Sequence, residues 1–127
     1  MFENSAPFSG FSVDDIDAAR TFYTETMEMT VGEDHGMLQL QIRPEVAVLV
    51  YPSDQHRPGS YTVLNFPVDD IDAAVDALIE RGVAFEIYDG FGQDERGVSR
   101  NEGGPPIAWF RDPAGNILSV LEESGPS

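Results

Sequence analysis

The residues of this sequence best suited to acid–base or metal chemistry are two histidines, His35 and His56, and two aspartate doublets, Asp14-Asp15 and Asp69-Asp70. Imidazole and carboxylate groups are the usual ligands of catalytic divalent metals and the usual general acids and bases. There is no cysteine, so disulfides and thiolate metal sites are excluded. A metal or acid–base site is therefore one interpretation of the doublets.

Each doublet lies inside a stretch that the chain contains twice. Residues 11–19 and 66–74 are identical at eight of nine positions, which indicates an internal duplication. Apolar residues alternate before each doublet, as in a half-buried strand, and recur at helical spacing after it. A carboxylate at such a junction can accept the free N–H groups of the first helical turn. The same doublet at the same junction in both copies favours helix capping.

Length and charge narrow the class of protein. With 127 residues, 13.9 kDa and no apolar run near the ~20 residues of a membrane span, the chain is expected to be a single soluble, cytoplasmic domain with one shared core. Its net charge is −16 and it has no lysine. Such a surface repels phosphate backbones and anionic membranes, so neither nucleic acid nor a membrane is an expected partner.

The chain divides into two modules, at about residues 6–52 and 61–123, with a linker at 53–60; the stretch 52–60 holds two prolines, Gly59 and charged residues. The pattern predicts the order strand, helix, strand, strand, strand in each module. The predicted elements span 6–13, 15–27, 30–33, 37–42 and 46–51, then 61–68, 71–81, 83–88, 107–111 and 117–122. The second module also has a long glycine-rich connection, Gly90–Gly104, which favours a loop that covers a cleft over an inert loop.

These motifs together resemble the vicinal oxygen chelate superfamily, which includes glyoxalase I, extradiol dioxygenases, fosfomycin-resistance enzymes and bleomycin-resistance proteins. The resemblance rests on Val-Asp-Asp-Ile-Asp-Ala-Ala in each module, Phe22-Tyr23 on the first helix, and Asp112-Pro-Ala-Gly-Asn116 before the last strand. It implies an α+β fold of two βαβββ modules that form an open, U-shaped half-barrel with a ligand cleft inside. It also favours a homodimer.

Metalloenzymes of that superfamily hold a divalent ion on four side chains of the concave face. The resemblance places these positions on Phe8, on Val48 or Leu49, on Val63 and on Ser119. Hydrocarbon side chains and one hydroxyl do not replace imidazole and carboxylate ligands, so no metal and no other cofactor is expected. The alternative is a relocated metal site that uses His35 or His56.

Strand alternation predicts which side chains line the cleft. If Asp112–Asn116 closes a hairpin, Trp109 lies opposite Ser119 on the concave face. The predicted ligand-binding residues are Phe8, Gly10, Tyr61, Val63, Asn65, Arg96, Trp109 and Ser119. This set is typical of a pocket for a small, partly apolar organic molecule, although the same side chains could instead fill a core that has lost its ligand.

Three functions remain open from the sequence. The first is a metal-free protein that binds a small molecule; the second is a lyase or dioxygenase-type enzyme of the same superfamily with an unrecognised site. The third is a non-catalytic dimeric subunit with a filled cleft. No catalytic residue can be assigned, since Ser119 has neither a histidine at a predictable distance nor a nucleophile turn around it.

Overall fold

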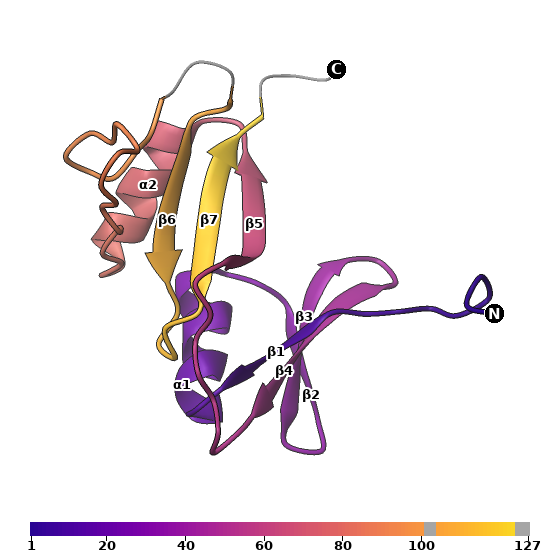
Figure 1. The fold of residues 1–127 in the computed structure, drawn as a ribbon. Coiled ribbons are helices and arrows are strands. Elements are labelled where there is room, and N and C mark those ends of the chain that lie inside the picture. Colours follow the sequence, from indigo (N-terminus) through magenta and orange to yellow (C-terminus); the bar gives the residue numbers. More distant parts are fainter. Residues whose placement is uncertain (101–103, 124–127) are drawn as a thin grey trace. The chain divides into compact units, whose positions relative to one another are not determined.

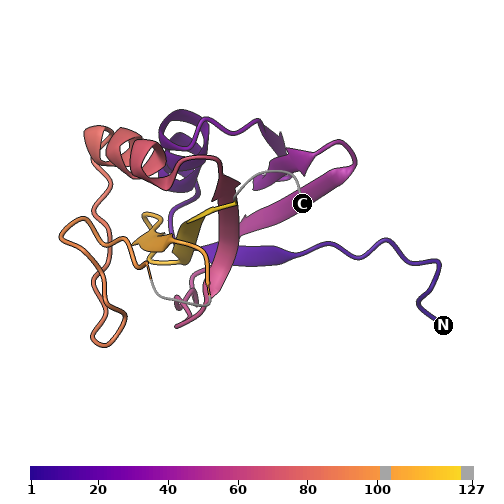
Figure 2. The ribbon, with the colours of Figure 1, turned by 90° about the horizontal axis from the view of Figure 1, so that it is seen from above.

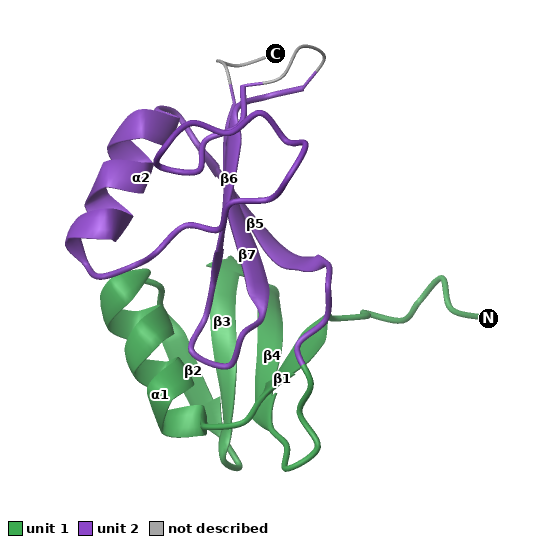
Figure 3. Ribbon diagram, turned by 60° about the vertical axis from the view of Figure 1, so that its left-hand side comes forward, with its two compact units in different colours: residues 1–57 green, residues 58–127 purple. Residues whose placement is uncertain are grey.

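The computed structural model describes residues 1–100 and 104–123. The chain forms two compact units, Met1–Arg57 and Pro58–Ser127, whose boundary lies inside the predicted linker (Figure 3). None of the helices in the described residues is long and apolar enough to span a membrane.

Unit 1 has the predicted order of one strand, one helix and three strands (Figure 1). Its sheet has the strand order β1-β4-β3-β2, with β1 parallel to β4 and the other neighbours antiparallel. The helix α1 continues directly into a short π-helical segment, η1. The elements are β1 (Gly10–Val13), α1 (Ile16–Thr21), η1 (Phe22–Thr26), β2 (Val31–Asp34), β3 (Met37–Arg43) and β4 (Val46–Pro52).

The two faces of the unit 1 sheet differ as the alternation predicts. Phe11 and Val13 of β1 are buried, and Tyr23 on the helical segment is fully buried with its ring 6.1 Å from that of Phe11. Arg20 of α1 forms an ion pair with Glu33 of β2 at 2.8 Å, and Glu33 lies in register with the buried Leu38, so the helix lies on this same face. Gly10 and the residues in register with it therefore lie on the opposite, open face.

Unit 2 contains β5 (Thr62–Val68), α2 (Ile71–Glu80), β6 (Ile107–Arg111) and β7 (Ile117–Glu122). The sheet order is β5-β7-β6, with β5 parallel to β7 and β6 antiparallel to it. The four elements agree with the predicted ones within a residue at each end. The α+β fold class of paired βαβββ-type modules with open sheets is therefore confirmed.

The strand predicted at residues 83–88 is reduced to one bridge, between Phe85 and Phe110, followed by a hydrogen bond from the Glu86 N–H to the Trp109 carbonyl at 2.8 Å. The reason is a side chain that competes for the backbone. Gln93 donates to the Glu86 carbonyl at 2.7 Å and accepts from the Tyr88 N–H at 2.6 Å. Because these backbone groups are engaged by an amide, they do not extend the ladder.

The helix α2 covers one face of the unit 2 sheet. Glu122 of β7 accepts a hydrogen bond from the Ile71 N–H at the start of α2, at 3.1 Å. Leu118 and Val120 share that strand face with Glu122 by alternation, and both are buried. Ser119 therefore lies on the opposite face, together with Trp109, which pairs with it across β6 and β7.

The aspartate doublets cap the helices, as predicted. The second aspartate of each doublet is the N-cap: Asp15 accepts from the N–H groups of Asp17 and Ala18, and Asp70 accepts from that of Ala73, all at 3.1 Å. These bonds satisfy backbone donors that have no partner within the helix.

Candidate functional site

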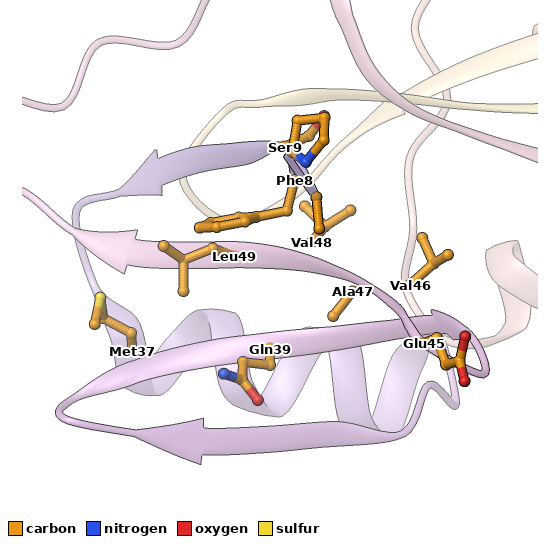
Figure 4. A pocket seen from close by; sticks show the side chains of 11 residues that line it. Phe8, Ser9, Met37, Gln39, Glu45, Val46, Ala47, Val48 and Leu49 are labelled. Atoms are coloured by element: carbon orange, nitrogen blue, oxygen red, sulfur yellow. The ribbon is translucent and has the colours of Figure 1, made fainter. Parts of the chain in front are cut away.

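The open face of unit 1 carries a groove of about 740 Å³ between the N-terminal segment and strands β3 and β4 (Figure 4). The segment before β1 runs extended beside β4, since the Leu49 N–H donates to the Ser9 carbonyl at 3.0 Å. Phe8 keeps 72% of its surface exposed and lies along the groove. Met37, Gln39, Ala47 and Leu49 are among the other residues that line it.

Two of the positions expected to hold metal ligands lie in this groove. The structure decides between Val48 and Leu49: Val48 pairs with Leu40 and is buried on the helix-covered face, whereas Leu49 pairs with Gly10 on the open face. In unit 1, the positions expected to hold metal ligands are therefore Phe8 and Leu49. Both side chains are hydrocarbon and offer no lone pair to a cation.

The other two positions lie in unit 2. Ser119 is completely buried, and its hydroxyl donates to the Asn65 side-chain oxygen at 2.6 Å. Val63 falls at a register shift between Thr62 and Leu64 of β5. Within residues 1–100 and 104–123, no three or more His, Cys, Asp or Glu side chains gather in a way that could hold a metal ion. The side chains present do not fit the divalent ion of the superfamily's metalloenzymes.

An aromatic cluster lies beside Ser119 in unit 2. The rings of Tyr88, Phe91 and Trp109 contact one another edge to face, with centroid distances of 5.7 Å for Tyr88–Phe91, 5.7 Å for Tyr88–Trp109 and 5.2 Å for Phe91–Trp109. Sequence reasoning identified Trp109 but missed the other two. Its only available signal was the closeness of Tyr88 and Phe91 in the sequence, at the start of the glycine-rich connection.

The hydroxyl of Tyr88 is buried without a hydrogen-bond partner among the described residues. Its burial raises the pKa of the phenol above its ordinary value, and the nearby Glu86 carboxylate adds to this increase. The hydroxyl is therefore protonated at neutral pH. It is a hydrogen-bond donor that finds no acceptor within residues 1–100 and 104–123.

Arg96 was predicted to meet a ligand, and the structure gives it carboxylate partners on α2. Its guanidinium pairs with Asp72 and, at 2.7 Å, with Asp76, while Arg100 also contacts Asp72 at 2.6 Å. The Arg96 hydrogen bond is the main cause that lowers the pKa of Asp72. The ligand role of Arg96 stays a prediction. Residues 101–103 of the same connection lie outside the described residues.

The remaining predicted residues separate between the units. Gly10 lies on the open face of unit 1, where a Cβ would come within 3.2 Å of the Leu49 carbonyl oxygen. Tyr61 is 68% exposed and its ring lies against Gly59. Within unit 2, Asn65, Ser119 and Trp109 form a row across three neighbouring strands on the face opposite α2.

Sequence reasoning also missed a contact between Ser12 and His56, whose Oγ and Nδ1 atoms lie 2.6 Å apart. These residues are distant in the sequence, so no local pattern predicts the contact. Ser12 lies within β1 and not on the sharp turn that exposes a nucleophilic serine. The contact ties the segment after β4 to β1.

A sequence profile of the glyoxalase/bleomycin resistance protein/dioxygenase superfamily matches residues 8–120. The chain belongs to this superfamily. TnmS3, an antibiotic-binding protein from Streptomyces sp. CB03234, is 28% identical with a TM-score of 0.67, over 95% of this chain and 98% of that one. The fosfomycin resistance protein FosX from Listeria monocytogenes is 10% identical with a TM-score of 0.71, over 95% of this chain and 94% of that one.

A superfamily member from Sphaerobacter thermophilus is 24% identical with a TM-score of 0.70, over 93% of this chain and 98% of its own. The likenesses to this protein and to FosX show the fold alone. No curated protein sequence matches this chain. The family and fold inferred from the sequence are confirmed.

Proposed function

We propose that this superfamily member binds a small, partly apolar organic molecule on the open faces of its sheets without a metal ion. One observation carries the proposal: the two unit 1 positions expected to ligate a metal, Phe8 and Leu49, instead line an apolar groove of about 740 Å³. Small-molecule sites are commonly ~300–1,000 Å³, mostly apolar, with a few polar groups. Gln39 and Glu45 supply polar groups here.

The likeness to an antibiotic-binding protein supports the same conclusion, because it shows that a protein with this fold and 28% identity functions as a binding protein. The lyase or dioxygenase-type alternative would need a site other than the four expected metal-ligand positions, because those side chains supply no imidazole or carboxylate. The homodimer and the cytoplasmic location expected from the sequence remain part of the proposal.

The test uses N-phenyl-1-naphthylamine, a neutral apolar dye whose fluorescence rises in an apolar site. We expect saturable binding to the wild-type protein and roughly tenfold weaker binding to the Phe8→Ala variant, because burial of a phenylalanine ring contributes about 1.5–3 kcal/mol. The matched control is Phe2→Ala, since Phe2 is 77% exposed in the same N-terminal segment and does not line the groove. No saturable binding, or equal affinities of the wild type and Phe8→Ala, would refute binding in the groove.

The metal-free part of the proposal has its own measurement. Elemental analysis of protein purified without chelator is expected to find no stoichiometric divalent metal. About one equivalent of tightly held zinc, nickel, manganese or iron would overturn this part.

A further inference from the structure

We propose that Tyr88, Phe91 and Trp109 of unit 2 form a recognition site for a neutral, planar aromatic ring system that carries a hydrogen-bond acceptor. Phe91 occupies the place of the ligand ring in the free protein, and Tyr88 donates the hydrogen bond that selects the acceptor. This inference rests on the proposed binding function and names its ligand class.

The cluster is a stacking surface already assembled by the sheet. Trp109 is held in β6 by its pairing with Ser119 of the central strand, so its ring has a fixed base on the open face. Rigid aromatic side chains contribute large contact area with little side-chain entropy to lose. A fused-ring ligand would cover more of the indole than the single ring of Phe91 does.

Phe91 is the replaceable member of the cluster. It lies outside the regular strands, is 41% exposed, and contacts both Trp109 and Tyr88 edge to face. The backbone around it is anchored, since Ser99 donates to the Phe91 carbonyl at 2.7 Å and Gln93 bridges the Glu86 and Gly97 carbonyls. The proposal therefore assigns the displacement to the Phe91 side chain, with its backbone staying in place.

The buried hydroxyl of Tyr88 defines the polar part of the ligand. A buried donor without an acceptor destabilises the structure that contains it, and an acceptor that reaches the donor removes that cost. The Tyr88 hydroxyl is such a donor among the described residues, and its ring lies 5.7 Å from that of Trp109. A carbonyl oxygen on a ring stacked against Trp109 is the chemistry that satisfies it.

The rest of the face agrees with this ligand class. Asn65, which accepts from Ser119 in the same row as Trp109, is exposed at the β5 end of the row. The side chain of Asn65 can orient a second polar group of the ligand. The net charge of −16 disfavours anionic compounds, so a ketone fits better than a carboxylate.

The experiment compares two planar probes of nearly the same shape, 9-fluorenone with its carbonyl and fluorene without it. Equilibrium dialysis gives the dissociation constants, and the indole N–H resonance of Trp109, the single tryptophan, reports where the probes bind. The variants are Tyr88→Phe, Phe91→Ala and, as the matched control, Ile87→Ala, because Ile87 is 60% exposed and has no part in the aromatic contacts. Thermal melting verifies that each variant is folded.

For the wild type we expect fluorenone to bind roughly fivefold to tenfold tighter than fluorene, with a shift of the Trp109 resonance. In Tyr88→Phe the ratio of the fluorene dissociation constant to the fluorenone dissociation constant is expected to fall to about one. The affinity for fluorene itself is expected to stay unchanged. Phe91→Ala is expected to bind both probes several-fold tighter, because no ring has to be displaced. Ile87→Ala is expected to match the wild type.

The role of Tyr88 would be overturned if the wild type bound fluorenone and fluorene equally well. It would also be overturned if Tyr88→Phe still preferred fluorenone as strongly as the wild type does. Unchanged or weaker binding to Phe91→Ala would overturn the role of Phe91. These failures are distinct from failure of the binding function itself. In that case N-phenyl-1-naphthylamine would also show no binding that depends on Phe8.

Discussion

At the scale of single residues, the site is defined by what its side chains can and cannot donate. Leu49 and Phe8 place hydrocarbon where a metalloenzyme needs a lone pair, and Ser119 directs its hydroxyl to Asn65. Tyr88 is the converse case, a buried donor with no acceptor among the described residues. The proposed binding therefore relies on apolar contact and hydrogen bonding.

Asp112 is a residue whose role is structural, and its replacement by alanine is expected to cost about 2–3 kcal/mol of unfolding free energy. Its buried carboxylate accepts from the Ala114 N–H at 3.0 Å, the Asn116 N–H at 2.8 Å and the Asn116 amide at 3.0 Å. One hydrogen bond to a charged group contributes about 1.5–3 kcal/mol, and the contributions of bonds in one small network do not add, so the expected loss stays near that of a single bond. Urea denaturation measures the change. The control, Asp89→Ala at an exposed position, should stay within about 0.5 kcal/mol of the wild type; equal effects would contradict this role.

At the scale of elements, two features position the two candidate sites. One is the repeated strand-to-helix junction, and the other is the connection that follows residues 83–88. Each junction places the helix on one face and leaves the other face open. The connection returns to the sheet at Ser99, which exchanges hydrogen bonds with Ile107 at 2.8 and 3.0 Å. Within this connection, Phe91 contacts Trp109 of β6 and Arg96 forms an ion pair with Asp76 of α2.

The helix caps give a matched comparison inside each doublet. Asp15→Ala and Asp70→Ala are each expected to lose about 1 kcal/mol of stability, the usual effect of removing an N-cap side chain. Asp14→Ala and Asp69→Ala are the controls, since the caps of α1 and α2 do not use these exposed neighbours. Chemical denaturation of the four variants would refute the capping role if both members of a doublet cost the same.

The ion pairs of Asp72 predict a pH dependence. Because Arg96 and Arg100 lower the pKa of Asp72 in the folded state, its contribution to stability is present above the unfolded pKa of about 4 and is lost as the pH falls through the lower folded value. The difference in unfolding free energy between wild type and Asp72→Asn should therefore be constant near neutral pH. It should shrink in acid below about pH 4. A difference that is independent of pH would contradict the electrostatic origin.

At the scale of the whole molecule, the dominant property is the excess of 23 acidic over 7 basic residues. Like charges at this density repel one another in the compact state, and the repulsion is screened as the Debye length falls from ~30 Å at 0.01 M salt to ~3 Å at 1 M. We therefore expect the stability of the fold to depend on its ionic environment.

We expect the melting temperature to rise between about 0.01 M and 1 M NaCl, with most of the increase at the low end, where screening changes fastest. Differential scanning calorimetry measures the effect. KCl at equal ionic strength is the control, because screening does not distinguish the two cations. A melting temperature that does not change, or that falls, would show that self-repulsion is not a significant term.

The sequence by itself determined the family, the order of the modules, the helix caps and the face on which Phe11, Val13, Trp109 and Ser119 lie. These features depend on local periodicity and on short motifs, which are set by residues close together in the chain. The alternation could not decide between Val48 and Leu49, because that choice depends on the register with β1.

Only the tertiary structure decided the contacts that carry the further inference. Tyr88 and Phe91 contact Trp109 where the strand predicted at 83–88 is reduced to one bridge and the Gln93 side chain bonds to the backbone of Glu86, Tyr88 and Gly97. His56 also contacts Ser12, from which it is far apart in the sequence. The ring contacts with Trp109 and the Ser12–His56 contact both join residues far apart in the sequence, and no periodicity in the sequence encodes them.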